Sequence, residues 1–274
     1  MSLHDARAFY ARLTVAKGGG DEMLTRAFEA VDRAAFVGPG PWKVFAGAGY
    51  VETPGADPAL VFQDEVIALK PDLGINNGEP SLHARCLAAA APKPGETAIH
   101  VGAGTGYYTA ILAELVGRNG RVDAYEVEAD LADTARTLLG AWPQVTVHAR
   151  SALEPPLPAV DVIYVSAGLS HPPIVWLEAL KPGGRLIFPL TAGRVGGLMM
   201  LLTRTGDDVY AVRLVSGAMF IPCVGGQDER QAQALMSALS GGAHAAVRSL
   251  RRGQPDATAW LAGDDWWFST ATVD

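Results

Sequence analysis

Short apolar runs alternate with helical patterns through the middle of the chain, and this alternation limits the possible folds more than any other feature. The runs that predict strands cover residues 97–101, 121–127, 145–149, 161–165 and 185–189. The segments with helical spacing cover residues 107–116, 129–139 and 174–180. Strand–helix–strand units close as right-handed crossovers and build a parallel sheet covered on both faces. Two further strands, 198–203 and 209–220, predict an antiparallel hairpin at the edge of this mostly parallel sheet of an α/β protein.

The N-terminal part has a different sequence pattern. Residues 3–16 and 21–35 have helical spacing, whereas residues 38–80 are rich in Gly, Pro and Asp. We expect two helices followed by loops with little regular structure, in the position of a cover.

The C-terminal part also differs from the middle. Residues 227–240 predict a helix, and 246–250 with 258–270 predict a β-hairpin. Adjacent Trp266 and Trp267 point to opposite faces of a strand, so we expect one to pack inward and the other to be partly exposed. The resulting division is 1–80 (helices and cover), 81–226 (core) and 227–274 (small helix and β-hairpin extension).

Charge and cysteine content narrow the class of protein. With 29 acidic and 22 basic side chains the net charge is −7, which argues against a nucleic-acid partner held through phosphates. The chain has no uncharged apolar run of about 18 residues, and charges in residues 1–16 argue against a signal peptide, so no membrane partner is expected. Two cysteines form no disulfide framework, which favours a cytoplasmic location. No pattern of residues indicates a metal site or an oligomeric state.

A glycine-rich turn follows the strand at 97–101 and opens the next helix. It contains Gly102, Gly104 and Gly106. Glycines there let the backbone approach a ligand, and the helix N-terminus offers free N–H groups. A dinucleotide fingerprint needs glycine where this chain has Tyr107, so an oxidoreductase with a nicotinamide or flavin cofactor is disfavoured. Glu126 ends the next strand, where a carboxylate can accept hydrogen bonds from both ribose hydroxyls; a packing turn with a solvated Glu is the plain alternative.

The order of several further motifs resembles the protein-L-isoaspartate O-methyltransferase family, within the class I methyltransferases. The resemblance covers residues 27–225 and is carried by Ala30-Val31-Asp32-Arg33-Ala34-Ala35-Phe36-Val37, Phe62-Gln63-Asp64, Pro80-Ser81-Leu82-His83-Ala84, Leu180-Lys181-Pro182-Gly183-Gly184-Arg185-Leu186 and Phe220-Ile221-Pro222. It implies a Rossmann-like sheet and S-adenosyl-L-methionine as cofactor. The cofactor residues it implies are His100, Gly102, Ala103, Gly104, Gly106, Glu126 and Ser151.

Three positions depart from the pattern of that family. His100 stands where members usually have an acid that holds the cofactor's ammonium, and Gly78 stands where they have a serine before the proline of the substrate loop. Ser151 stands where they have an aspartate that faces the adenine. A neutral His100 ring could accept a hydrogen bond from the ammonium, whereas an imidazolium would repel it. Cofactor affinity is therefore expected to weaken below about pH 6.5.

The expected reaction is an in-line methyl transfer, in which the protein aligns two reactants and excludes water. A protein or peptide carboxylate, with a pKa of about 4, needs no general base. A small-molecule phenol, alcohol or amine would need one, and Glu79, His83 or His100 could serve. Glu79, Ser81 and His83 are the candidate acceptor-side residues, and Glu79 would favour a neutral or cationic acceptor by about a kcal/mol or more. A non-catalytic binding protein that has lost the cofactor is the alternative from another class.

Overall fold

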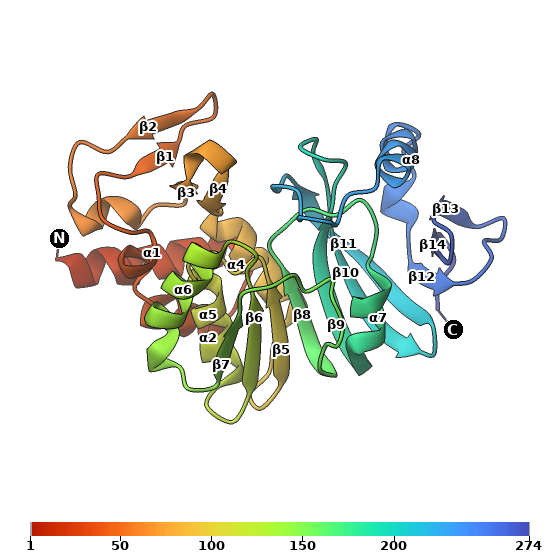
Figure 1. Ribbon diagram of the computed structural model, residues 1–274, viewed down its shortest axis with the longest axis horizontal. Coiled ribbons are helices and arrows are strands. Elements are labelled where there is room, and N and C mark those ends of the chain that lie inside the picture. Colours follow the sequence, from red (N-terminus) through yellow and green to blue (C-terminus); the bar gives the residue numbers. More distant parts are fainter. Residues whose placement is uncertain (1, 274) are drawn as a thin grey trace. The chain divides into compact units, whose positions relative to one another are not determined.

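Figure 1 shows the computed structural model, which describes residues 2–273. The chain divides into two compact units. Unit 1 comprises the chain up to Glu96 together with Ala103–Ala149. Unit 2 comprises Thr97–Gly102 together with the chain from Arg150 onward. The glycine-rich turn therefore begins in unit 2 and continues in unit 1.

Three helices open unit 1: α1 (Leu3–Gly18), α2 (Glu22–Ala30) and α3 (Arg33–Phe36). Each starts at a polar cap, because the side chains of Ser2, Asp21 and Asp32 accept hydrogen bonds from backbone N–H groups of the first turn. The expected continuous helix over residues 21–35 is interrupted at Val31, whose backbone is extended, because Asp32 caps a new turn.

The segment expected to be irregular forms a small antiparallel sheet, so that expectation was wrong. Its strands, in the order β2-β1-β3-β4, are β1 (Lys43–Phe45), β2 (Tyr50–Glu52), β3 (Ile67–Lys70) and β4 (Ile75–Asn77), with short 3₁₀ turns η1 (Pro58–Val61) and η2 (Pro71–Leu73). The sheet has its own apolar cluster of Val37, Trp42, Val61 and Ile67, each at most 5% exposed. This cluster explains why such short strands are ordered. We call residues 43–77 the cover sheet.

The rest of unit 1 follows the predicted alternation. Its elements are α4 (Pro80–Ala90), α5 (Tyr107–Val116), β6 (Arg121–Tyr125), α6 (Ala129–Leu138), η3 (Leu139–Ala141) and β7 (Val145–His148). Every residue of α5 except Glu114 is buried, as expected of a helix that is apolar nearly all round. β6 and β7 pair in parallel, so their carboxyl ends share one edge.

Unit 2 contains one sheet in the order β13-β14-β12-β11-β10-β9-β8-β5. Its strands are β5 (Thr97–Val101), β8 (Val160–Val165), β9 (Leu180–Leu190), β10 (Gly197–Gly206), β11 (Val209–Ala218), β12 (Ser249–Arg252), β13 (Ala259–Ala262) and β14 (Trp266–Ser269). Its helices are α7 (Ile174–Ala179), α8 (Glu229–Ser240) and the short η4 (His244–Ala246). β5, β8 and β9 pair in parallel, and β9, β10 and β11 pair antiparallel, which confirms the predicted fold class.

The C-terminal extension adds three strands to this sheet rather than a two-stranded hairpin. β12 pairs with residues 209–211 of β11, β14 pairs with β12, and β13 pairs with β14. Both tryptophans of β14 are buried, Trp266 at 5% and Trp267 at 4% exposure, so the expectation that one is partly exposed was wrong. Trp266 meets Phe268 edge-on, and the guanidinium of Arg251 lies 5.6 Å from the Trp267 ring centroid. Both faces of this part of the sheet are therefore covered.

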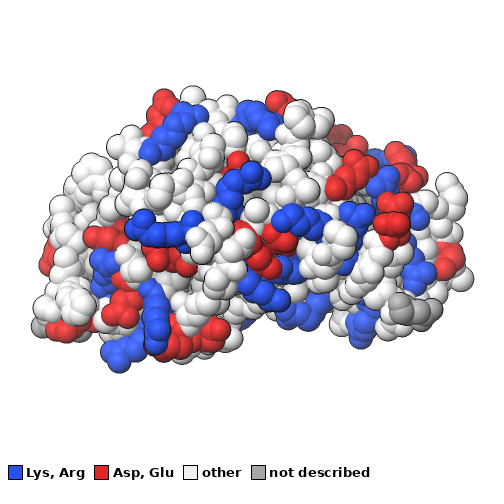
Figure 2. All heavy atoms as spheres, turned by 90° about the horizontal axis from the view of Figure 1, so that it is seen from below, with Lys and Arg blue, Asp and Glu red and all other residues white. Residues whose placement is uncertain are grey.

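The surface and the helices give further information. Acidic and basic side chains are interspersed on the face shown in Figure 2. Within residues 2–273, no helix has both the length and the apolar character needed to cross a bilayer. The same residues contain no group of three or more His, Cys, Asp or Glu side chains arranged to hold a metal ion.

Phe268 provides a test of how firmly the extension is built into unit 2. Its side chain is fully buried in β14, so Phe268→Ala should lower the free energy of unfolding by about 3–5 kcal/mol. Urea unfolding followed by far-UV circular dichroism measures this loss. Met219→Ala, at a 68% exposed residue, is the control and should change stability by less than about 0.5 kcal/mol. A loss below about 1 kcal/mol for Phe268→Ala would mean that the extension unfolds independently.

Candidate functional site

The glycine-rich turn needs its glycines for two different reasons. Gly102, Gly104 and Gly106 have φ values of 73°, 57° and 99°, in the left-handed region that side chains disfavour. A Cβ on Gly106 would also lie 2.8 Å from the Leu139 side chain. A Cβ on Gly104 would meet only Leu69, at 3.5 Å. Gly106 thus serves packing and caps α5, whereas Gly104 keeps an open backbone just before the helix N-terminus, a kind of position that can accommodate a ligand.

Glu126 is placed beside this turn. It directly follows β6, is 7% exposed, and accepts a hydrogen bond through Oε2 from the Gly104 N–H at 2.7 Å. Its Oε1 accepts from the Glu128 N–H at 3.0 Å. An ionised carboxylate can accept about four hydrogen bonds, so these two leave room for the two hydroxyl donors of a ribose. The structure therefore brings together the two parts of the predicted cofactor motif that lie in unit 1. The free acceptor positions of Glu126 fit the ribose hydroxyls of an adenosyl cofactor.

The cover sheet reaches the same turn. Lys70, the last residue of β3, forms ion pairs with Glu128 at 2.7 Å and Asp130 at 2.8 Å. Its neighbour Leu69 is the residue that faces Gly104. The two acidic partners lie two and four residues after Glu126, so Lys70 holds the cover sheet near the proposed ribose-binding carboxylate.

The predicted residues of unit 2 are ordered by local contacts. His100 is 1% exposed, and its Nε2 lies 3.0 Å from the Oγ of Ser166, which follows β8. Burial lowers the pKa of His100 to about 3. The ring is therefore neutral at physiological pH, and the expected loss of cofactor affinity below pH 6.5 has no basis in this residue. Ser151 accepts a hydrogen bond from the Leu153 N–H at 3.1 Å and so closes a tight turn.

The predicted acceptor-side residues surround the start of α4. Glu79 precedes the helix without capping it, and accepts a hydrogen bond from the Ser81 hydroxyl at 3.0 Å. Asp64 supplies the missing cap, because it accepts from the Ser81 N–H at 2.8 Å and from Lys17 at 2.9 Å. Burial alone would raise the pKa of Asp64, but these hydrogen bonds lower it below its usual value. His83, one turn into the helix, is 3% exposed and stacks on Tyr108.

Arg33 is a structural centre that sequence reasoning missed. It is fully buried and flanked by the rings of Tyr10 and Tyr107, at 5.8 and 6.0 Å. Its N–H groups donate to Asn77 Oδ1 and to the carbonyl oxygens of Val61, Gln63, Glu65 and Asn77. Arg33 thereby fixes the chain both before β3 and at the end of β4. Arg33 and Asp64 lie within the motifs that resemble the family. This was the only feature of the sequence that could have pointed to their structural roles.

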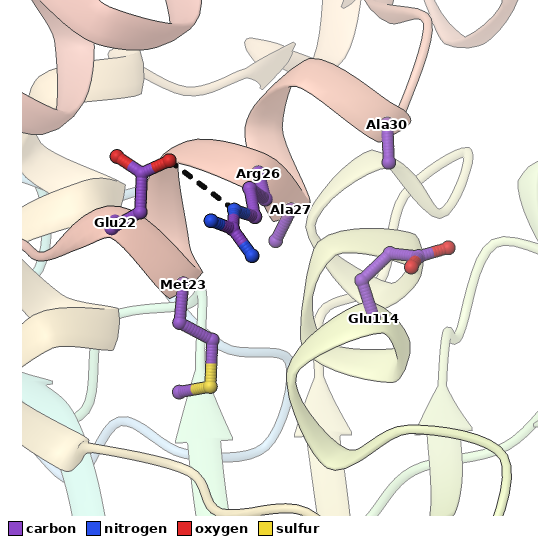
Figure 3. Close-up of a pocket in the computed structure, with 6 residues that line it drawn as sticks. All are labelled: Glu22, Met23, Arg26, Ala27, Ala30 and Glu114. Carbon is purple, nitrogen blue, oxygen red and sulfur yellow. Dashed lines mark hydrogen bonds and ion pairs between the residues drawn. The ribbon is translucent and has the colours of Figure 1, made fainter.

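A surface hollow of about 430 Å³ lies away from all these residues. It is lined by Glu22, Met23, Arg26, Ala27 and Ala30 from α2 and by Glu114 from α5 (Figure 3). Glu22 and Arg26 pair with each other at 3.2 Å across one helical turn. None of the predicted site residues faces this hollow, so it is a surface feature of the helices.

Comparison with known proteins agrees with the geometry. The family model for protein-L-isoaspartate(D-aspartate) O-methyltransferase matches residues 14–228. The protein-L-isoaspartate O-methyltransferase of Pyrobaculum neutrophilum is 32% identical over 207 residues, which is 73% of this chain and 90% of the relative. That of Methanopyrus kandleri is 37% identical over 139 residues, 49% of this chain, and the match spans only 61% of the relative's length.

A solved structure supports the fold. A Plasmodium falciparum protein described as a protein-L-isoaspartate O-methyltransferase, in complex with S-adenosyl-L-homocysteine, superposes with a TM-score of 0.63 at 18% identity, over 79% of this chain and 97% of that one. The sheet, the glycine-rich turn and the acid beside it define a class I methyltransferase that uses S-adenosyl-L-methionine. The chain belongs to the protein-L-isoaspartate(D-aspartate) O-methyltransferase family.

The buried His100 generates a prediction for stability. Its folded-state pKa of about 3 lies below the unfolded value of about 6.5, so the unfolded chain binds the extra proton first and stability falls as pH drops from 6.5 towards 3. Between pH 7 and pH 5 the free energy of unfolding should fall by about 2 kcal/mol through this residue. Urea unfolding at both pH values measures the change, and His100→Asn should lack this part of it. Equal pH dependence in both proteins would show that His100 titrates normally.

Proposed function

We propose that the chain transfers the methyl group of S-adenosyl-L-methionine to the carboxylate of L-isoaspartyl residues in proteins or peptides. The observation that carries the proposal is the buried Glu126 carboxylate, held by the Gly104 N–H beside the helix N-terminus. Membership of the family supplies the acceptor class, because its description and its relatives carry that activity in their names. Both cysteines are free, in keeping with the reducing cytoplasm that we propose as its location.

The cofactor residues that we propose are His100, Gly102, Ala103, Gly104, Gly106, Glu126 and Ser151. When bound, the cofactor supplies a methyl group activated by its sulfonium. Glu126 would accept hydrogen bonds from the ribose hydroxyls through its two remaining acceptor positions. His100 would act as a neutral ring that offers hydrogen bonding without charge.

The acceptor side fits a carboxylate nucleophile. A carboxylic acid with a reference pKa of about 4 is already ionised at neutral pH, so no residue has to remove a proton. We therefore assign Glu79, Ser81 and His83 to orientation of the acceptor. The Glu79 side chain is exposed, where water and salt screen its charge, so its repulsion of an anionic acceptor is weaker than the sequence suggests.

Glu126 provides the test of the cofactor assignment. Glu126→Gln keeps the size of the side chain but removes the charge, and should weaken S-adenosyl-L-homocysteine binding at least about tenfold, since a hydrogen bond to a charged group contributes about 1.5–3 kcal/mol. Isothermal titration calorimetry measures this difference. Glu22→Gln, on the exposed pair of α2, is the matched control and should bind like the unmodified protein. Equal affinity in both variants would remove Glu126 from the site.

The acceptor is tested by methylation of two synthetic peptides that differ only at one residue, L-isoaspartyl in one and L-aspartyl in the other. With radiolabelled S-adenosyl-L-methionine, we expect label on the isoaspartyl peptide alone. The product should be a methyl ester, so mild base should release the label as methanol. Absence of transfer to the isoaspartyl peptide by a protein that binds S-adenosyl-L-homocysteine would contradict the assigned acceptor.

A further inference from the structure

The backbone conformation at position 78 does not require glycine. The neighbouring side chain of His83 does. Gly78 lies outside the left-handed region in which side chains are strained. A Cβ built on it would lie 2.2 Å from Nε2 and 2.8 Å from Cδ2 of His83. Contacts below 3.0 Å are essentially absent between real Cβ atoms and their neighbours. The imidazole of His83 therefore occupies the space that any side chain at position 78 would need.

The His83 ring is held in this position by Tyr108. The two rings stack with centroids 3.6 Å apart and planes within 4°. The Tyr108 hydroxyl in turn donates a hydrogen bond to the Gly78 carbonyl oxygen at 3.0 Å. Tyr108 thus contacts both the His83 ring and the turn at Gly78, and the imidazole could yield to a larger residue 78 only by giving up its stacked position.

This cluster is joined to the proposed cofactor turn. Tyr108 belongs to the first turn of α5, which begins directly after Gly106. Position 78 lies immediately before Glu79 and Pro80, where α4 begins. The polar Nε2 edge of His83 therefore lies where the substrate-side turn meets the helix that starts at the glycines.

We propose that His83 determines acceptor selectivity by presenting its imidazole in place of a side chain at position 78. Only one of the two positions can place a side chain in this space. Either residue 78 or the imidazole of His83 then supplies the polar contact to the acceptor. This inference rests on the proposed function, because it assigns residues 78–83 to the acceptor side.

The test is a cycle of variants: Gly78→Ser, His83→Val and both together. Gly78→Ser should lower Tm by several degrees, because the His83 ring would have to leave its stacked position on Tyr108. His83→Val should raise KM for the isoaspartyl peptide about tenfold, the loss expected for one hydrogen bond to a charged group. The double variant should recover Tm and bring KM to within about threefold of the unmodified protein, since serine now fills the vacated space.

Two readouts separate a role in selectivity from a merely structural one. The dissociation constant for S-adenosyl-L-homocysteine should stay within twofold in every variant. The ratio of kcat/KM for L-isoaspartyl and D-aspartyl peptides should change at least fivefold in His83→Val. His83→Gln keeps a hydrogen-bonding group, so its KM should stay close to that of the unmodified protein. This variant keeps the test valid if His83→Val folds poorly. Gly55→Ser, at a glycine with nothing within 4 Å of its Cβ position and an ordinary φ, is the control and should leave Tm unchanged.

The inference is overturned if KM and the peptide ratio are unchanged in both His83 variants, or if the double variant is no better than the sum of the single ones. Failure of the proposed function looks different, because the unmodified protein would then methylate neither peptide. An active unmodified protein with insensitive variants thus contradicts the role of His83 and leaves the activity in place.

Discussion

The buried guanidinium of Arg33 is the interaction on which the N-terminal part of the protein depends. A charge without a carboxylate partner is costly to bury, and here five hydrogen bonds to oxygen atoms replace its water. Those oxygens come from the segment that leads into β3 and from the last residue of β4. Lysine could not reproduce this planar set of donors. The position of Leu69 and Lys70 near the glycines therefore rests on the hydrogen bonds of this arginine.

The binding end of the fold combines rigid and open backbone. Gly106 is fixed by Leu139, whereas Gly104 keeps its N–H directed at Glu126. In unit 2, a buried and neutral His100 ring stands where members of the family were expected to carry an acid. Under the proposed function, the Glu126 carboxylate would supply specificity for the cofactor, in a fold that aligns reactants rather than transferring protons.

The features that could be predicted from the sequence are those that depend on residues close together in the chain. The glycines do have positive φ values, the acid after the next strand does lie beside them, and the alternating patterns did predict the core. The cover sheet was not predicted because strands of three or four residues show no hydrophobic periodicity. Packing against Trp42 and Val61 holds these strands in place. The role of Arg33 was missed because four of its five hydrogen bonds go to backbone carbonyl oxygens, which every residue has. The pairing of Gly78 with His83 depends on how a turn meets the following helix, and spacing alone does not show that contact.

The three added strands change which backbone groups the unit 2 sheet leaves unpaired. Without them, β11, a strand of ten residues, would present its outer N–H and C=O groups along its whole length. β12 covers residues 209–211 of it, and the outermost strand becomes β13, which has four residues and an irregular register beside β14. A long, regular rim is a template for self-association and aggregation, whereas a short and irregular one is a poor template. At the 209–211 end of β11, the extension therefore replaces a regular rim with a short, irregular strand that is a poor template for self-association.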